Sequence, residues 1–143
     1  MIKIEWDDYL ATGIDVIDMD HKILLGLINQ VFDVGVEKDD AKLTLILESL
    51  ADYVDEHFKR EEILMQICGY KNLEEHKEKH RKITETVQGL FKIYQTNPAL
   101  VNIDGFQTFL ADWLPTHILN EDHGYKDTLL ANRDLIEMVK DRI

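Results

Sequence analysis

Residues 73–94 read LEEHKEKHRKITETVQGLFKIY, and an apolar residue or a histidine recurs in this stretch at steps of three and four. Leucine, isoleucine, valine and tyrosine fill most of these positions, whereas His76 and His80 fill the other two. Alternating steps of three and four residues are typical of a helix that packs a narrow stripe against nearly parallel neighbours. The stretch therefore predicts one helix of a bundle, with two histidines facing the interior.

Three other stretches carry the same spacing and predict three more helices. They span residues 14–31, 43–64 and 106–117. Because the connections between them are short, we expect successive helices to run antiparallel beside one another. The expected fold class is all-α: an up-down-up-down antiparallel four-helix bundle with an N-terminal arm at residues 1–16 and a short C-terminal helix near residues 125–141.

Residues that commonly break or cap helices mark the expected ends of these segments. Asn72, with Glu75 three residues later, resembles a capping box, and Asp104 is placed to cap the fourth segment. The chain shows no repeat, linker or low-complexity run, so residues 1–143 are expected to form a single domain. Breaks between segments are expected at Gly35, Asp39–Asp40, Gly69 and Asn97–Pro98.

The composition restricts the kinds of partner. The 16 Lys and Arg residues against 28 Asp and Glu residues give a net charge of -12, which disfavours nucleic acid and anionic membrane surfaces. The single cysteine, Cys68, excludes an internal disulfide and a thiolate zinc cluster. No signal peptide is recognisable, and no apolar run approaches the roughly 20 residues of a spanning helix. We expect a cytoplasmic protein, take it to be a monomer, and expect no nucleic-acid or membrane partner.

Polar residues occupy positions of the interior stripe where a bundle normally carries leucine or valine. Burying an imidazole or a carboxylate without a partner costs on the order of 2 kcal/mol or more. One such histidine is most often an ordinary core residue with its hydrogen bonds satisfied, but five of six histidines in phase with the interior favour a bound cation. The polar residues in phase are His21, His57, Glu61, His76, His80 and His117.

The spacing of these residues suits metal ligation. His57 and Glu61 are four residues apart, as are His76 and His80, so each pair presents two ligand atoms on one helical face. One zinc ion takes four ligands and would not use the whole set. The residues favour two metal ions instead.

Asp122 adds a seventh candidate ligand, but its spacing from His117 is irregular. Five residues rotate an ideal α-helix by about 140°, away from the face of His117. Asp122 joins the cluster only if the helix ends, tightens or bulges between Ile118 and Glu121. Pro115 favours an irregularity here, because proline lacks a backbone donor and kinks helices.

Donor counting indicates that the two metals differ. We let both carboxylates and one solvent oxygen bridge the pair. A metal with three histidines then has a full octahedral set, whereas a metal with two histidines keeps one position open. An open position on a redox-capable metal suits a small diatomic ligand. Imidazole and carboxylate ligands suit iron, zinc, copper or nickel, so the spacing does not determine which metal is bound.

The residue set resembles the seven-ligand signature of the hemerythrin family in its bacterial form. The surrounding sequence is also similar, from Gly13-Ile-Asp-Val-Ile-Asp-Met-Asp-His21 to Trp113-Leu-Pro-Thr-His117. The resemblance extends from about Trp6 almost to the end of the chain. The matching positions are His21, His57-x-x-x-Glu61, His76-x-x-x-His80 and His117-x-x-x-x-Asp122.

This resemblance implies a non-haem centre of two iron ions that binds O2 reversibly. It implies that Glu61 and Asp122 bridge the two ions together with an oxo or hydroxo group, and that O2 binds at the iron with the open position. The protein would then carry, store or deliver O2 to an unidentified accepting protein, and would not be an enzyme. The saturated iron would take His76, His80 and His117, and the open iron would take His21 and His57.

Three apolar residues near the ligands are candidate walls of the O2 pocket. Phe58, Trp113 and Ile118 each lie next to a ligand or one helical turn away. Ordinary core packing explains them about as well, and both interpretations stay open. We expect His123 to face solvent and Cys68 to have no role at the metals.

Other functions are compatible with the same ligands. The alternatives are a di-iron sensor of O2, NO or redox state, and a di-iron protein that detoxifies peroxide or NO. A structural zinc bundle is the weakest alternative. Oxidases of this architecture use ligand sets richer in carboxylates, which stabilise high-valent iron better, and this difference favours carriage.

Overall fold

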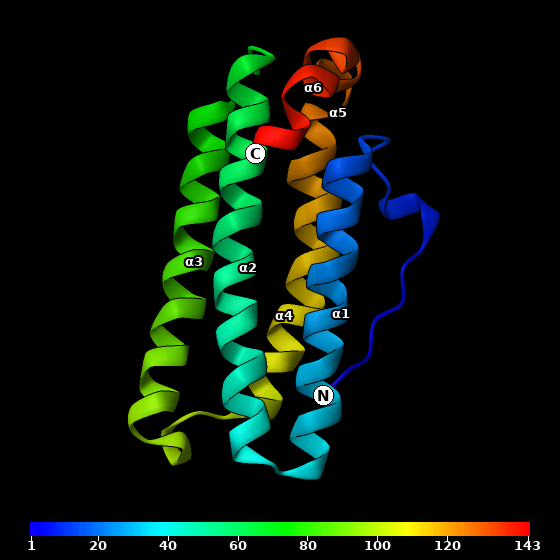
Figure 1. Ribbon diagram of the computed structural model, residues 1–143. Coiled ribbons are helices and arrows are strands. Elements are labelled where there is room, and N and C mark those ends of the chain that lie inside the picture. The colour runs from blue at the N-terminus through cyan, green and yellow to red at the C-terminus, as the bar shows by residue number, and fades with distance from the viewer.

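The computed structural model describes residues 1–143, and its regular secondary structure is entirely helical. Four long rods stand side by side, and successive rods run in opposite directions (Figure 1). The predicted all-α, up-down-up-down four-helix bundle is therefore confirmed. The first three rods are α1 (Asp15–Glu37), α2 (Asp40–Ile67) and α3 (Leu73–Thr96).

The fourth rod consists of three consecutive segments. It begins as α4 (Ile103–His117), passes through a π-helical turn (Ile118–Asp122) and continues as α5 (His123–Leu130). The C-terminal helix α6 (Arg133–Val139) then folds over the end of the bundle (Figure 1). The predicted short C-terminal helix near residues 125–141 is therefore confirmed, and the first residues of this stretch also extend the fourth rod. Short 3-10 turns lie at Asp8–Leu10, Pro98–Leu100 and Lys140–Arg142.

Three of the four predicted breaks between segments are confirmed, and one is wrong. Gly69 follows α2 with a φ of +73°, and Asn97–Pro98 separates α3 from α4. Gly35, however, lies inside α1, which ends when Lys38 takes a left-handed conformation with a φ of 56°. The Asp39 side chain then accepts a hydrogen bond from the Lys42 amide and begins α2 at once.

Two of the predicted caps are wrong. Asn72 precedes α3 but its side chain makes no capping hydrogen bond, so there is no capping box with Glu75. At α4 the cap is Asn102, whose side chain accepts from the Gly105 amide, while Asp104 lies in the first turn. Glu75 and Asp104 still lie in the first turns of their helices, where a negative charge suits the positive end of the helix dipole.

The predicted N-terminal arm is confirmed and runs outside α1 (Figure 1). Two side chains of the bundle hold its first residues. The Ile2 amide donates to the Gln107 side chain at 2.8 Å, and Ile4 exchanges two hydrogen bonds with the Asn29 side chain, at 2.9 and 2.7 Å. These bonds replace the ladder partners that an extended segment otherwise lacks.

The apolar core of the bundle is divided into two clusters. The larger fills the end of the bundle where α1 meets α2, and the smaller fills the end covered by α6. On α1, Ile17 belongs to the smaller cluster, Leu24 to the larger, and His21 lies between them. The same order holds on the other rods, so a buried polar layer separates the two clusters. No helix of the chain is both long enough and apolar enough to span a bilayer.

Candidate metal centre

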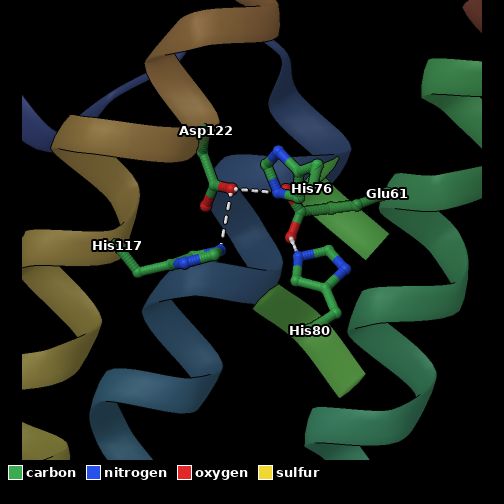
Figure 2. Close-up of side chains that lie close together, drawn as sticks. All are labelled: Glu61, His76, His80, His117 and Asp122. Atoms are coloured by element: carbon green, nitrogen blue, oxygen red, sulfur yellow. Dashed lines mark ion pairs between the residues drawn. The ribbon is translucent and has the colours of Figure 1, made fainter. Parts of the chain in front are cut away.

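The polar layer brings together the seven side chains that the sequence singled out, from all four rods. Every one of them is at most 6% exposed. Figure 2 shows five of them pointing toward a common centre. The seven are His21 from α1, His57 and Glu61 from α2, His76 and His80 from α3, His117 from α4 and Asp122 from the π-helical turn.

The π-helical turn explains how Asp122 reaches this layer. A π-turn takes up more residues than an α-turn, so a residue five positions after His117 returns toward the same face. The predicted irregularity between Ile118 and Glu121 is confirmed. Pro115 lies inside α4 without ending it, and the π-turn begins three residues later.

The candidate ligand atoms fall into two groups that share both carboxylates. Within each group the ligand atoms lie within 4.8 Å of one another. We call these the three-histidine group and the two-histidine group. The three-histidine group contains His76, His80 and His117, the two-histidine group contains His21 and His57, and Glu61 and Asp122 belong to both.

Asp122 and Glu61 each collect imidazole nitrogens around their oxygens. Asp122 lies 3.0 Å from Nε2 of His21 and 3.0 Å from Nε2 of His76 through its two different oxygens. Glu61 Oε1 lies 2.6 Å from Nε2 of His57 and 3.7 Å from Nε2 of His80. Each carboxylate therefore contacts both groups, as a bridging ligand must.

Many of these buried atoms have no hydrogen-bond partner. The set includes both oxygens of Asp122, Oε1 of Glu61 and Nε2 of His76, His80 and His117. Leaving one such group unpaired costs about 1–3 kcal/mol, so a cluster of them requires compensation. Imidazole nitrogens and carboxylate oxygens are the donors that iron and its neighbouring metals accept. The side chains present thus fit a metal centre.

Hydrogen bonds behind the ligands fix two of the rings. His57 Nδ1 lies 2.9 Å from Asp20 Oδ2, and His80 Nδ1 lies 2.8 Å from Glu62 Oε2. A proton on Nδ1 leaves Nε2 free to bind a metal and makes the ring a stronger donor. The hydroxyl of Tyr125 donates to Glu61 Oε2 at 2.5 Å and orients that carboxylate.

These three supporting residues were missed by the sequence analysis. Asp20 directly precedes His21, and Tyr125 follows Asp122 by three residues, or about one helical turn. Their positions beside ligands were a usable signal. Their partners lie on other rods, however, and spacing along one helix says nothing about contacts between helices.

His57 and His80, one histidine from each group, differ in charge when no metal is bound. Burial lowers the pKa of His57, but the charge of Glu61 and the hydrogen bond to Asp20 outweigh burial and raise this pKa to about 10. Burial lowers the pKa of His80 to about 3 against the opposing charge of Glu61. The two-histidine group therefore holds a proton that a metal must displace, whereas His80 is already neutral.

The candidate pocket walls lie against the three-histidine group. The ring of Phe58 stacks on His80 with centroids 3.8 Å apart, and Trp113 stacks on His117 with centroids 4.7 Å apart. Ile118 is buried in the larger apolar cluster. These contacts serve packing directly, and the role of the three residues as walls of an O2 pocket stays a prediction.

Two further residues were placed by the sequence analysis away from the ligands. His123 was expected to face solvent, but it is half-buried and its Nε2 lies 3.3 Å from the Leu10 carbonyl, so it faces the N-terminal arm. Cys68 follows α2, packs against the smaller apolar cluster and is not among the clustered ligands. Burial raises the pKa of its thiol, which makes it less reactive.

Comparison with known proteins identifies relatives that share this architecture. The model of the hemerythrin HHE cation binding domain family matches residues 12–129. A bacteriohemerythrin of Pseudomonas aeruginosa is 34% identical over 142 residues, covering 99% of this chain and 90% of the relative. A bacteriohemerythrin of Methylococcus capsulatus is 33% identical over 121 residues, covering 85% of this chain and 92% of the relative.

Solved structures show the same fold. The crystal structure of a wild-type hemerythrin superposes with a TM-score of 0.84 at 31% sequence identity, covering 90% of this chain and 98% of that one. A variant of hemerythrin with Leu114 replaced by alanine superposes equally well. The family match, the relatives and the structures agree, and the chain belongs to the hemerythrin family.

Proposed function

We propose that this protein binds O2 reversibly at a centre of two iron ions held by the seven clustered side chains. The observation that carries the proposal is the unequal division of the ligands. Three histidines serve one position and two serve the other, while both carboxylates belong to each group. Two ions held in this way are not equivalent, and the one with fewer ligands keeps a place for a small molecule.

Glu61 and Asp122 would hold the two iron ions jointly, and the iron pair would supply the vacant coordination position and the electrons that binding of O2 requires. The protein holds the pair in a layer sealed by apolar clusters at both ends. Bulk water is kept from the two-histidine group, whose histidines are at most 1% exposed, while O2 is small and apolar enough to enter. Asp20 and Glu62 keep the Nε2 atoms of their histidines directed at the layer.

The ligand chemistry favours carriage over turnover. Five imidazoles are neutral when they bind metal, and only two ligands are anionic. Oxidases built on the same architecture use more carboxylates, which stabilise highly oxidised iron better. We therefore infer that the bound O2 is released unchanged to an accepting protein.

The test is oxygenation of the iron-loaded, fully reduced protein. We expect about two irons per chain, a pink-violet colour in air and repeated bleaching under vacuum. Sustained consumption of peroxide or NO would instead support the detoxifying alternative. Zinc without iron after expression in iron-replete medium would contradict the proposal.

A further inference from the structure

Asp20 is a buried carboxylate on α1 that lies behind the candidate ligand His57. It is only 3% exposed, and it directly precedes His21. Three donors from α2 converge on it: His57 Nδ1 at 2.9 Å, Arg60 Nη1 at 2.6 Å and the Tyr53 hydroxyl at 2.6 Å. A buried charge held by three donors is fixed in one place, because each lost partner would leave it uncompensated.

The arrangement of the donors divides the work between the two oxygens of Asp20. Oδ2 faces both His57 and Arg60, whereas Oδ1 accepts only from Tyr53. The negative charge strengthens His57 as a donor to a metal, because it draws the Nδ1 proton toward the carboxylate. Arg60 contacts the same oxygen and withdraws part of that charge.

In the three-histidine group, Glu62 contacts His80 in the same way, but its charge acts on the ring less strongly. Glu62 accepts from His80 Nδ1 at 2.8 Å, but its side chain is 24% exposed against 5% for Asp20. Arg60 and Tyr53 have no counterpart among the hydrogen bonds of Glu62. Water screens an exposed charge, so Glu62 influences its ring less than Asp20 does.

We propose that Asp20, Arg60 and Tyr53 form a positioning network that sets how strongly His57 donates to the metal of the two-histidine group. The inference rests on the proposed function, since it assigns the network to the metal that takes O2. Asp20 strengthens the donation and stabilises the oxidised metal. Arg60 opposes Asp20, and Tyr53 holds the carboxylate in line.

The test compares two variants that change charge but keep size. Asp20→Asn should raise the midpoint potential of the iron-loaded centre, because the remaining amide oxygen still accepts from His57 but carries no charge. Arg60→Gln should lower the midpoint potential, because Asp20 then keeps its full charge toward His57. A role in folding alone would move both variants in the same direction or move neither.

An exposed ion pair on the same helix provides matched controls. Asp55 and Lys59 lie 2.7 Å apart on α2, with side chains 40% and 69% exposed. Asp55→Asn and Lys59→Gln change the net charge by the same amounts as the two test variants. Both controls should leave the midpoint potential at the wild-type value, since solvent and salt screen exposed charges.

A second measurement uses Zn²⁺ and does not depend on O2. We expect Asp20→Ala to lower the Zn²⁺ affinity of the two-histidine group by about 10- to 100-fold in chelator competition. In the Zn²⁺-loaded wild type, nitrogen NMR should show His57 protonated at Nδ1 and bound through Nε2. Tyr53→Phe is the mildest variant and should move the midpoint potential slightly in the direction of Arg60→Gln.

The outcomes separate this inference from the proposed function. If the wild type binds O2 reversibly but Asp20→Asn and Arg60→Gln do not shift the potential in opposite directions, the network is overturned. If Asp20→Ala weakens Zn²⁺ binding as expected but the wild type does not bind O2, the positioning role stands and the proposed function fails. Unchanged Zn²⁺ affinity in a folded Asp20→Ala protein would also overturn the network.

Discussion

The two ligand groups share a centre but differ in their surroundings. In the two-histidine group, His21 and His57 are fully buried, and His57 is backed by a buried network of charged and hydrogen-bonding side chains. In the three-histidine group, His117 lines a surface groove of about 340 Å³ and His80 lines another of about 240 Å³. The two-histidine group, where we propose that O2 binds, is therefore the more deeply enclosed of the two, and the three-histidine group lies nearer solvent.

The two groups are therefore shielded and held in place by different kinds of neighbour. At the three-histidine group, Phe58 stacks on His80 and Trp113 stacks on His117, and each ring lines the same groove as its histidine. At the two-histidine group, hydrogen bonds fix the ring of His57 and packing excludes water. A reactive position is safest where no groove ends on it, while a saturated position tolerates solvent nearby.

The largest expected effect comes from removing a histidine of the two-histidine group. His57→Ala should abolish O2 binding and lower the iron content from about two to about one per chain, because the three-histidine group keeps its five ligands. Most of the helical signal in circular dichroism should remain. Iron analysis and the visible spectrum before and after air measure both effects.

His123→Ala is the matched control for that prediction. His123 is also a histidine of the bundle, but it contacts the N-terminal arm and belongs to neither group. Its loss should leave two irons and normal O2 binding. If His57→Ala still binds O2 reversibly, the division into an open and a saturated metal is wrong.

The next effect concerns the aromatic rings that stack on the three-histidine group. Phe58→Ala should cost about 3–5 kcal/mol of stability, because it empties a buried ring site in the core. It should also speed removal of iron by a chelator, because the groove beside His80 then extends inward. Denaturant unfolding and the rate of chelation measure the two consequences separately.

Leu50→Ala distinguishes access from simple loss of stability. Leu50 is equally buried in the larger apolar cluster but lines neither groove, and its truncation should cost about 2–5 kcal/mol. Chelation should stay slow in this variant when both proteins are compared well below their unfolding midpoints. Equal chelation rates in the two variants would show that Phe58 does not guard the centre.

The sequence predicts the bundle and the convergence of the seven polar side chains well, because both depend on spacing along single helices. His76 and His80 share one face of α3 whatever surrounds them. The five-residue step from His117 to Asp122 even predicts the irregular turn, since no regular α-helix brings both to one centre. Periodicity carries this information directly.

Other features depend on contacts between segments and are invisible to periodicity. In the sequence, Asp20 resembles any acid near the start of a helix, and only α2 places three donors around it. Lys38, rather than Gly35, takes the left-handed position at the end of α1, because the two-residue connection to Asp40 fixes where the chain must reverse. His123 faces the arm because the arm folds back across its rod.

The smallest expected effect is a pH dependence of the metal-free protein. The pKa of His57 is raised to about 10 in the folded state, against an ordinary value near 6.5 when unfolded. The folded protein therefore binds the extra proton between these values, and stability falls as pH rises through that window. The slope should be of the order of 1 kcal/mol per pH unit between pH 7 and 9 in denaturant unfolding.

Metal loading and one substitution test the origin of that slope. The slope should vanish in the Zn²⁺-loaded protein, because a metal on Nε2 replaces the proton in both conditions. It should also become smaller in metal-free His57→Gln, which cannot bind this proton, while the raised pKa of His117 leaves a weaker slope of the same sign. His80→Gln should leave the slope in place, because burial keeps the pKa of His80 at about 3 and the ring neutral throughout this range. Equal slopes in His57→Gln and His80→Gln would mean that His57 does not hold the extra proton, and the contrast between a protonated His57 and a neutral His80 would then be wrong.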